Sequence, residues 1–372
     1  MKVSIITTGL KVGGAETVLL NIVKELLKSN LKINILSLSD TCYLDKSFKD
    51  LGVDVKNYNL KSPTNFLRGL LTLCKDLRKT NPKIVQTWMP HADLIGGIIA
   101  KILTSAKIIW ACHHADMSLK SLKFPTLVIF RINSILSYLV PDKIVAVSEH
   151  VKTQLIKNGF NKRSLIVIEN GIDCSIYKFS TSKKNLFSYE NGIKPHKNII
   201  GFIGRYSPEK RPQDFIKLAS LLTKDSREIH FIMVGEGNEK SNKELTDLIT
   251  LNNLTDKISL LGIRKDLPAI FSSLDLVVST SEDEAFGMIL IEALSCGCPC
   301  ISTNNAGAIS VGKEYIKYAD VGDITTFYSL VNDVLVLSNQ EINLFRQEAS
   351  KYAQSRFSIQ TTANSYLKIY GL

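Results

Sequence analysis

Residues 198–210 of this chain read Asn-Ile-Ile-Gly-Phe-Ile-Gly-Arg-Tyr-Ser-Pro-Glu-Lys. The apolar run Ile199–Ile203 stops at a glycine, which is typical of a buried strand in a parallel sheet. A helical pattern follows over Phe215–Thr223, and the next apolar run is His230–Val234. Strand, turn and helix in this order predict a β-α-β unit, and such units build parallel sheets with helices on both faces.

The same alternation extends in both directions from this stretch, and its rhythm changes near Asn170-Gly171. We therefore expect two doubly wound, Rossmann-like α/β domains in tandem, residues 1–172 and 173–355. The polar stretch Phe179–Lys197 is interpreted as a linker. The other expected strands are Val3–Thr7, Ile33–Leu38, Ile84–Thr87, Lys107–Ala111, Lys143–Val147, Ile258–Leu261, Leu276–Thr280 and Cys300–Thr303, and the other expected helices are Thr17–Lys28, Phe66–Lys79, Ala92–Leu103, Thr126–Leu139, Leu245–Asn252 and Ile289–Ser295.

The composition is that of a globular protein with a basic balance. The 372 residues carry a net charge of +11 at a sequence pI of about 9.1, and 45% of them are hydrophobic. A basic balance favours an anionic partner. Because no long basic block or aromatic-basic signature is found, we expect phosphates and anionic lipid rather than nucleic acid.

Cysteine usage and the N-terminal sequence indicate a reducing, cytoplasmic compartment. The seven cysteines are odd in number and lack the spacing of a secreted disulfide framework. The opening MKVSIITTGL has too short an apolar run for a signal peptide, and no apolar run of about 18 residues could span a bilayer. The cluster Cys296-Gly-Cys298-Pro-Cys300 lacks the paired spacing of zinc ligands and is interpreted as small buried thiols, so no metal is expected.

Two loops could bind phosphate. Gly13 and Gly14 lie between the first strand and the first helix, where glycines let a ligand approach the backbone; a plain tight turn is the alternative. Arg205 and Lys210 follow the strand that ends at Gly204, and two cations there could neutralise a diphosphate. The alternative for this second loop is a solvated loop with surface charges.

The most informative stretch is Glu284-Ala-Phe-Gly-Met-Ile-Leu-Ile-Glu292. Eight helical residues span about 12 Å, so the two carboxylates cannot share one proton or one metal ion. They suit separate parts of an elongated ligand, such as a sugar and a ribose. The N–H groups of Gly287, Met288 and Ile289 could face an anion between them. The alternative is a helix N-terminal charge at Glu284 and a solvated face at Glu292, although apolar neighbours call for a partner there.

Taken in order, these pieces resemble family 4 of the retaining glycosyltransferases. The resemblance covers nearly the whole chain. The similar motifs are Gly-Gly-Ala-Glu at 13–16, Val147-Ser148-Glu149, Asn170-Gly171-Ile172-Asp173, Gly-Arg-x4-Lys at 204–210, Val234-Gly235-Glu236-Gly237, Leu261-Gly262 and Glu-x7-Glu at 284–292.

The resemblance implies a GT-B fold with the nucleotide-sugar donor in the second domain and the acceptor in the first. Residues 356–372, with a final helix around Ile359–Tyr370, would return to the first domain. By the same resemblance, Arg205 and Lys210 contact the donor diphosphate, and Glu292 binds the ribose hydroxyls. Glu284 contacts the transferred sugar and counts as catalytic. The remaining implied donor contacts are Gly13, Gly14, Phe286, Gly287, Met288 and Ile289.

The chain departs from the family pattern at two places. Ala285 stands where the family often has glycine, and alanine disfavours positive φ. The catalytic histidine that often follows the fourth strand of the first domain falls on His113 or His114, and a structural role for this pair is the alternative.

The resemblance also implies chemistry without a metal or other cofactor, because cations and helix N–H groups can stabilise the leaving diphosphate. A front-face mechanism with retention is carried over from the family. UDP is the expected nucleotide. Residues Met117–Leu139 mix basic and apolar side chains and could lie on an anionic membrane; a core helix with a basic rim is the alternative. The expected acceptor is a polyprenyl-diphosphate-linked sugar or another glycan. Alternatives on the same fold are a UDP-sugar 2-epimerase and a non-catalytic nucleotide-sugar-binding protein.

Overall fold

The structure is a computed structural model that describes residues 1–11, 13–40, 43–113, 124–190, 192, 198–224 and 228–372. The chain forms two compact units: Met1–Gly171 together with Ile359–Leu372, and Ile172–Ser358. The sequence places the breaks after residues 172 and 355, so the observed breaks lie one and three residues away.

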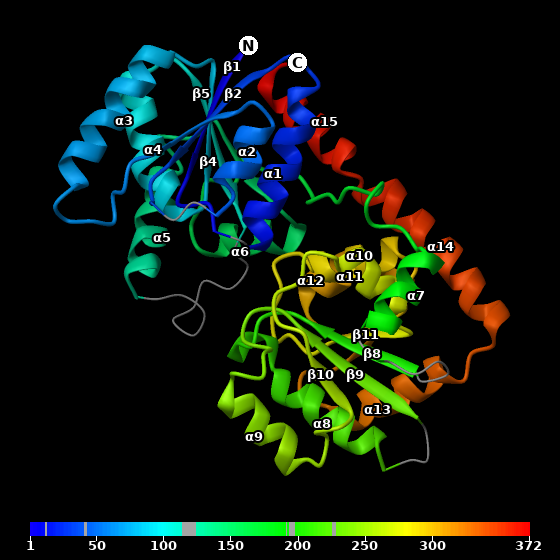
Figure 1. Ribbon diagram of the computed structural model, residues 1–372. Helices are drawn as coiled ribbons and strands as arrows, with labels where there is room; N and C mark the ends of the chain where they lie inside the picture. The colour runs from blue at the N-terminus through cyan, green and yellow to red at the C-terminus, as the bar shows by residue number, and fades with distance from the viewer. Residues whose placement is uncertain (12, 41–42, 114–123, 191, 193–197, 225–227) are drawn as a thin grey trace. The chain divides into compact units, whose positions relative to one another are not determined.

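The first unit is a seven-stranded parallel sheet in the order β3-β2-β1-β4-β5-β6-β7. Helices α3, α4 and α5 lie on one side of this sheet, and α1 and α15 contact each other on the other side (Figure 1). The elements are β1 Lys2–Thr7, α1 Gly14–Leu27, β2 Lys32–Ser37, α2 Asp45–Asp50, β3 Asp54–Asn57, α3 Phe66–Thr80, β4 Ile84–Trp88, α4 Pro90–Leu103, β5 Lys107–Cys112, α5 Phe124–Leu136, β6 Lys143–Ala146, α6 Glu149–Lys157, β7 Leu165–Val167 and α15 Ile359–Tyr370.

The second unit is a six-stranded parallel sheet in the order β10-β9-β8-β11-β12-β13. Its main core joins the sheet to α8, α9 and α13, while α7, α10, α11 and α14 contact one another on the other face (Figure 1). The elements are α7 Thr181–Glu190, β8 Asn198–Ile203, η1 Pro208–Lys210, α8 Pro212–Leu222, β9 Ile229–Val234, α9 Lys243–Leu251, β10 Ile258–Leu260, α10 Leu267–Ser273, β11 Leu276–Ser279, α11 Met288–Ser295, β12 Cys300–Thr303, α12 Ala306–Gly312, η2 Lys313–Tyr315, β13 Ile316–Ala319, α13 Ile324–Leu335 and α14 Asn339–Phe357.

The strands expected from the sequence are confirmed, with ends that agree to within one residue. The strands that the pattern missed are β3, β7 and β13, and each lies at an edge of its sheet. Edge strands are buried on fewer sides, so they lack the continuous apolar run of a central strand. In β3, for example, only Val55 of four residues is buried.

One expectation was wrong. The stretch Phe179–Lys197, interpreted as a linker, contains helix α7 over Thr181–Glu190; residues 191 and 193–197 lie outside the described residues. The helix packs against α10 through Phe187, which is almost fully buried. One buried aromatic among polar residues leaves too weak a period-3.6 pattern to predict a helix.

The final helix, α15, is held to the first unit by side chains along its length. The Thr362 hydroxyl donates to the Glu169 carbonyl at 2.9 Å, the Lys107 ammonium donates to the Ile369 carbonyl at 2.7 Å, and the Tyr370 hydroxyl donates to Gln86. At the crossing, a Cβ on Gly171 would lie 2.7 Å from the Ile359 Cα. Glycine therefore lets the two connecting segments approach each other.

Met89 joins β4 to α4 in a backbone conformation that normally requires glycine, with φ at +81° and ψ at 154°. The turn is held because the Met89 carbonyl accepts from the Ala92 and Asp93 N–H groups, and Asn133 donates to the Pro90 carbonyl at 2.8 Å. Such a residue stores about 1–3 kcal/mol of strain.

Met89→Gly is expected to raise the free energy of unfolding by about 1 kcal/mol, because relief of strain exceeds the entropy that glycine adds to the unfolded chain. Urea unfolding of the two proteins measures the difference. Leu94→Gly, at a half-buried position inside α4, is the matched control and is expected to destabilise. If Met89→Gly lost as much stability as the control, the Met89 backbone would not be strained.

Candidate functional site

The candidate site in the second unit lies where its strand order reverses. β8 continues to β9 on one side of the sheet, and β11 pairs with β8 on the other side. In doubly wound sheets, ligands bind outside the carboxyl ends of the two strands at this switch point. The loop after β8 carries Arg205 and Lys210, and the loop after β11 carries Glu284. The fold therefore brings these three predicted residues to one edge of one sheet.

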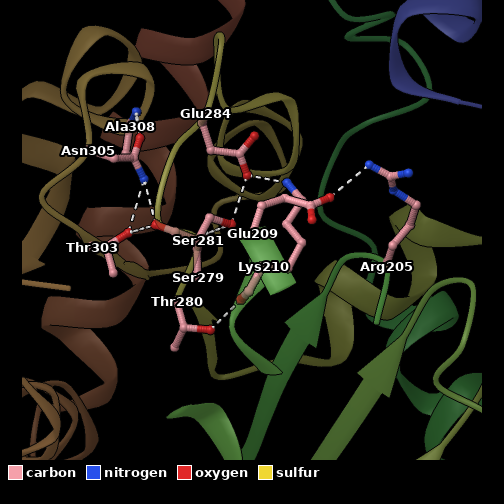
Figure 2. Close-up of polar contacts among 10 residues, drawn as sticks. All are labelled: Arg205, Glu209, Lys210, Ser279, Thr280, Ser281, Glu284, Thr303, Asn305 and Ala308. Carbon is pink, nitrogen blue, oxygen red and sulfur yellow. Dashed lines mark hydrogen bonds and ion pairs between the residues drawn. The ribbon is translucent and has the colours of Figure 1, made fainter. Parts of the chain in front are cut away.

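Hydrogen bonds to backbone carbonyls hold the two loops against each other, and Figure 2 shows the one from Thr280 to Lys210. The Thr280 hydroxyl donates to the carbonyls of Lys210 and Arg211 at 2.9 and 3.0 Å. The Glu282 N–H donates to the Glu209 carbonyl at 2.8 Å. Because each bond joins one loop to the other, the side chains that the loops carry are held in a fixed register.

Lys210 and Glu284 form the central ion pair of the site (Figure 2). Their side chains are 19% and 21% exposed, so the pair is partly shielded from water. The Ser281 hydroxyl also donates to the same Glu284 oxygen at 2.9 Å. An ammonium and a carboxylate are thus placed together, partly exposed to water, and each can exchange its partner for a ligand group.

Arg205 is far more accessible than Lys210. Its guanidinium pairs with the Glu209 carboxylate at 3.1 Å, and its side chain is 63% exposed. The two cations expected to share a diphosphate therefore each contact a carboxylate of the site's own loops in this structure. A ligand phosphate would compete with those carboxylates for the same donors.

The loop that carries Glu284 rests on a support that the sequence analysis missed. Thr303, the last residue of β12, and Asn305, just after the strand, donate to the Ser281 carbonyl (Figure 2). A Cβ on Gly307 would clash with the Glu284 carbonyl oxygen. The small residues Asn305-Ala306-Gly307 after an apolar strand were the available signal for this close approach.

Helix α11 begins beside this loop. Gly287 is its N-cap at φ +87°, a left-handed conformation that glycine adopts without strain. Phe286 is buried, while Met288 and Ile289 in the first turn are half-buried. The first N–H groups of a helix have no acceptor within the helix, so this turn can bind an anion.

Glu292 lies deeper in α11, and only 8% of it is exposed. Burial raises the pKa of its carboxyl to about 8, although a hydrogen bond from Tyr177 opposes that shift. Its Oε2 atom has no hydrogen-bond partner among the described residues. A buried carboxyl with an unsatisfied oxygen can accept a hydrogen bond from a ligand hydroxyl.

The remaining predicted residues belong to the first unit. Gly13 is the N-cap of α1 and Gly14 its first residue, after β1. Gly13 has extended backbone, but a Cβ there would lie 2.5 Å from a Glu16 carboxylate oxygen, so the absence of a side chain keeps the turn open. His113 follows β5 and is half-buried, with its ring 4.2 Å from the Trp88 ring. His114 lies outside the described residues.

Two points raised by the sequence can be settled from the structure. Ala285 is not among the described residues with positive φ, so alanine fits this loop without strain. Cys296, Cys298 and Cys300 are buried free thiols, and burial raises the pKa of each. In the part of the chain that is described, no three or more His, Cys, Asp or Glu side chains are grouped as metal ligands would be.

Two doubly wound units in one chain, with a loop of cations and carboxylates at the switch point of the second, are the architecture of the GT-B fold. Residues 12–176 match the sequence profile of the family described as "Glycosyltransferase Family 4", and residues 183–355 match "Glycosyl transferases group 1". The chain belongs to this family of glycosyltransferases.

Relatives of known name agree with this assignment. The chain is 25% identical to the Escherichia coli UDP-Gal:alpha-D-GlcNAc-diphosphoundecaprenol alpha-1,3-galactosyltransferase over 338 residues, 89% of this chain and 85% of that protein. It is 24% identical to the Staphylococcus aureus capsular polysaccharide biosynthesis glycosyltransferase CapM, over 79% of this chain and 78% of that protein.

Solved structures share the fold. Anabaena Alr3699/HepE, in complex with UDP and glucose, superposes with a TM-score of 0.88 at 20% identity, over 100% of this chain and 99% of that one. WaaG, a glycosyltransferase involved in lipopolysaccharide biosynthesis, superposes with a TM-score of 0.76 at 14% identity, over 99% of each chain.

Among the described residues, none of the helices has the length and apolarity needed to cross a membrane.

Proposed function

We propose that this glycosyltransferase moves a sugar from a UDP-sugar to a glycan or polyprenyl-diphosphate-linked acceptor in surface polysaccharide or lipopolysaccharide biosynthesis, with retention of configuration. The observation that carries the proposal is the Lys210–Glu284 pair at the switch point, beside Arg205 and the start of α11. The names of the relatives support the substrate classes: the Escherichia coli enzyme is named for UDP-Gal and a diphosphoundecaprenol acceptor, and Alr3699/HepE was solved with UDP.

The donor diphosphate binds Arg205, Lys210 and the free N–H groups of Gly287, Met288 and Ile289. Its phosphate oxygens replace the carboxylates that contact the two cations in the unliganded protein. As the bond between the anomeric carbon and the phosphate oxygen breaks, negative charge grows on the diphosphate. Because these hydrogen-bond donors are already fixed in place, they stabilise the transition state, in which the charge has grown, more than the intact sugar diphosphate. The step therefore needs no metal ion or other cofactor.

The rest of the donor is held by residues on both sides of the diphosphate. Glu292 accepts hydrogen bonds from the ribose hydroxyls, Phe286 lines the donor site, and Glu284 contacts hydroxyls of the transferred sugar. Gly13 and Gly14 leave the turn after β1 open to a phosphate or sugar group of the donor. His113 or His114 orients the sugar or acceptor.

Retention follows a front-face path. The acceptor hydroxyl attacks from the side on which the diphosphate leaves, its oxygen bonds to the anomeric carbon, and its proton passes to the departing phosphate. The protein then supplies position and charge stabilisation rather than a nucleophile. A polyprenyl-linked acceptor would bring the enzyme to the inner face of the membrane, where we place it as a cytoplasmic, peripheral protein.

A thermal-shift screen against UDP, GDP, ADP and their sugars tests the donor site. A nucleotide at 100 times its Kd is expected to add about 2.7 kcal/mol to the free energy of unfolding. The shift is expected to disappear in Arg205→Ala and Glu292→Ala and to persist in Lys217→Ala. The Lys217 side chain is 62% exposed and pairs with Asp214 on α8.

The outcomes separate the proposal from its alternatives. Release of UDP with sugar transfer to an acceptor supports it. Turnover of the donor to an epimer without acceptor would make the chain a 2-epimerase. A shift without any turnover would make it a nucleotide-sugar-binding protein, and no shift at millimolar nucleotide would refute the donor site.

A further inference from the structure

Helix α5 exposes an apolar stripe. Phe124, Val128, Ile132, Ile135 and Leu139, the last just beyond the end of the helix, are spaced four, four, three and four residues apart, which places them on one helical face. Their exposed fractions are 68%, 41%, 41%, 70% and 69%. A soluble helix normally turns such a stripe toward a core, so this one has no covering element within the described chain.

The neighbouring helices extend the exposed apolar surface. α4 contacts α5, α3 contacts α4, and the three lie together beside the first sheet (Figure 1). Ile102 on α4 and Leu67 and Leu71 on α3 are each at least 70% exposed. We call the exposed side of these three helices the α3–α5 face.

The exposed charges on these helices are all of one sign. The two acidic residues do not contribute, because Asp93 is buried and Asp76 is held by the Lys56 ammonium at 3.0 Å and the Tyr58 hydroxyl at 2.8 Å. The exposed basic residues are Arg68, Lys75, Arg78, Lys79, Lys101 and Arg131.

This charge pattern selects the occupant. A second copy of the chain docked through the same face would set cations against cations, because a two-fold interface pairs a patch with itself. An anionic lipid surface offers opposite charge to the basic residues and an apolar layer to the stripe. The sequence alone indicated Met117–Leu139 as a membrane-binding stretch, and residues 117–123 of that range lie outside the described residues. The helix that forms α3 was predicted, but not as part of this surface.

We propose that the α3–α5 face docks on an anionic bilayer, with the α5 stripe below the headgroups and the basic side chains of α3, α4 and α5 at the phosphates. The inference deepens the proposed acceptor class, since it gives the surface through which the enzyme would reach a lipid-linked sugar, and in that respect it rests on the proposed function. The docking itself depends only on the apolar stripe and the charges.

Co-sedimentation of the full chain with vesicles tests the surface. Vesicles of phosphatidylglycerol and phosphatidylcholine are compared with vesicles of phosphatidylcholine alone, at low and high salt. The wild type is expected to bind the anionic vesicles at least about 10-fold more tightly, and less tightly at high salt. In Ile135→Glu/Leu139→Glu, binding is expected to fall by about 10-fold or more, because the stripe can no longer enter the apolar layer.

The matched control is Tyr189→Glu/Leu251→Glu, which adds the same two charges at exposed apolar positions of the second unit, 86% and 80% exposed. It is expected to bind vesicles like the wild type. Equal binding by the α5 variant and the wild type would overturn the proposal, and so would a wild-type dimer that the α5 variant dissociates, which would make the face a subunit interface.

The thermal shift with UDP distinguishes a failure of membrane docking from a failure of the proposed function. A UDP shift retained in the α5 variant, with vesicle binding lost, supports docking and shows an intact fold. If the wild type binds vesicles as expected but no nucleotide shifts it, the docking surface stands and the donor proposal fails.

Discussion

Lys210→Ala is expected to weaken UDP-sugar binding by about 100-fold, which corresponds to about 2.7 kcal/mol. Two effects act in the same direction. The diphosphate loses a cation, and the Glu284 carboxylate loses its ion-pair partner and keeps the hydrogen bond from the Ser281 hydroxyl. An unpaired, partly shielded carboxylate then repels the phosphates, so the loss exceeds that of a surface charge.

Isothermal titration calorimetry with a UDP-sugar measures this change, and initial rates of transfer measure the loss of turnover. Lys217→Ala removes a lysine that is also paired with a carboxylate but lies on α8, and it is expected to behave like the wild type. A double-mutant cycle isolates the repulsion. Glu284→Gln added to Lys210→Ala is expected to recover about 10-fold in affinity, while unchanged affinity in Lys210→Ala alone would rule out this loop as the diphosphate site.

The central strands and the cationic loop were predictable because their signals are local. Ile199–Ile203 is an apolar run with a glycine at its end, and it forms β8. The apolar run after Gly287 forms α11, so Glu292 lies inside a helix as expected. Such features depend on residues that are neighbours in the sequence, so they can be predicted without knowing the fold. Glu284 lies in the loop four residues before that helix, so the distance of about 12 Å expected for eight helical residues does not describe the separation of the two carboxylates.

The features that were missed depend on contacts between distant residues. Thr303, Asn305 and Gly307 support the Glu284 loop only because β12 lies beside β11 in the sheet. The same holds for the partner of Lys210, because its pairing with Glu284 joins residues 74 positions apart. Residue types alone do not predict that a cation expected to bind phosphate contacts a carboxylate in the unliganded protein.

The buried carboxyl of Glu292 predicts a pH dependence of donor binding. Its pKa is raised to about 8, so the carboxyl is mostly protonated at neutral pH in the unliganded protein. Ribose hydroxyls that donate to the carboxyl favour its ionised form. Binding must therefore release a proton below pH 8. Affinity for a UDP-sugar is expected to rise by up to about 10-fold per pH unit below that value and to level off above it.

Titrations at several pH values with a UDP-sugar check this expectation, since the diphosphate diester has no proton to lose in this range. Glu292→Gln is expected to bind more weakly and without the pH dependence. Tyr177→Phe removes the hydrogen bond that lowers the pKa of Glu292, so its profile is expected to shift to higher pH. A flat profile in the wild type would show that Glu292 does not bind the donor as a carboxylate.

The same carboxyl links the stability of the unliganded protein to pH. Between its ordinary pKa of 4.5 and about 8, the folded state holds a proton that the unfolded state has lost. Stability contributed by Glu292 is therefore complete below pH 4.5 and is lost as pH rises through this window. Urea unfolding from pH 5 to 8 is expected to show a decline of a few kcal/mol in the wild type that is absent in Glu292→Gln. Parallel curves would place the carboxyl in contact with water, because only burial without full pairing holds the proton to so high a pH.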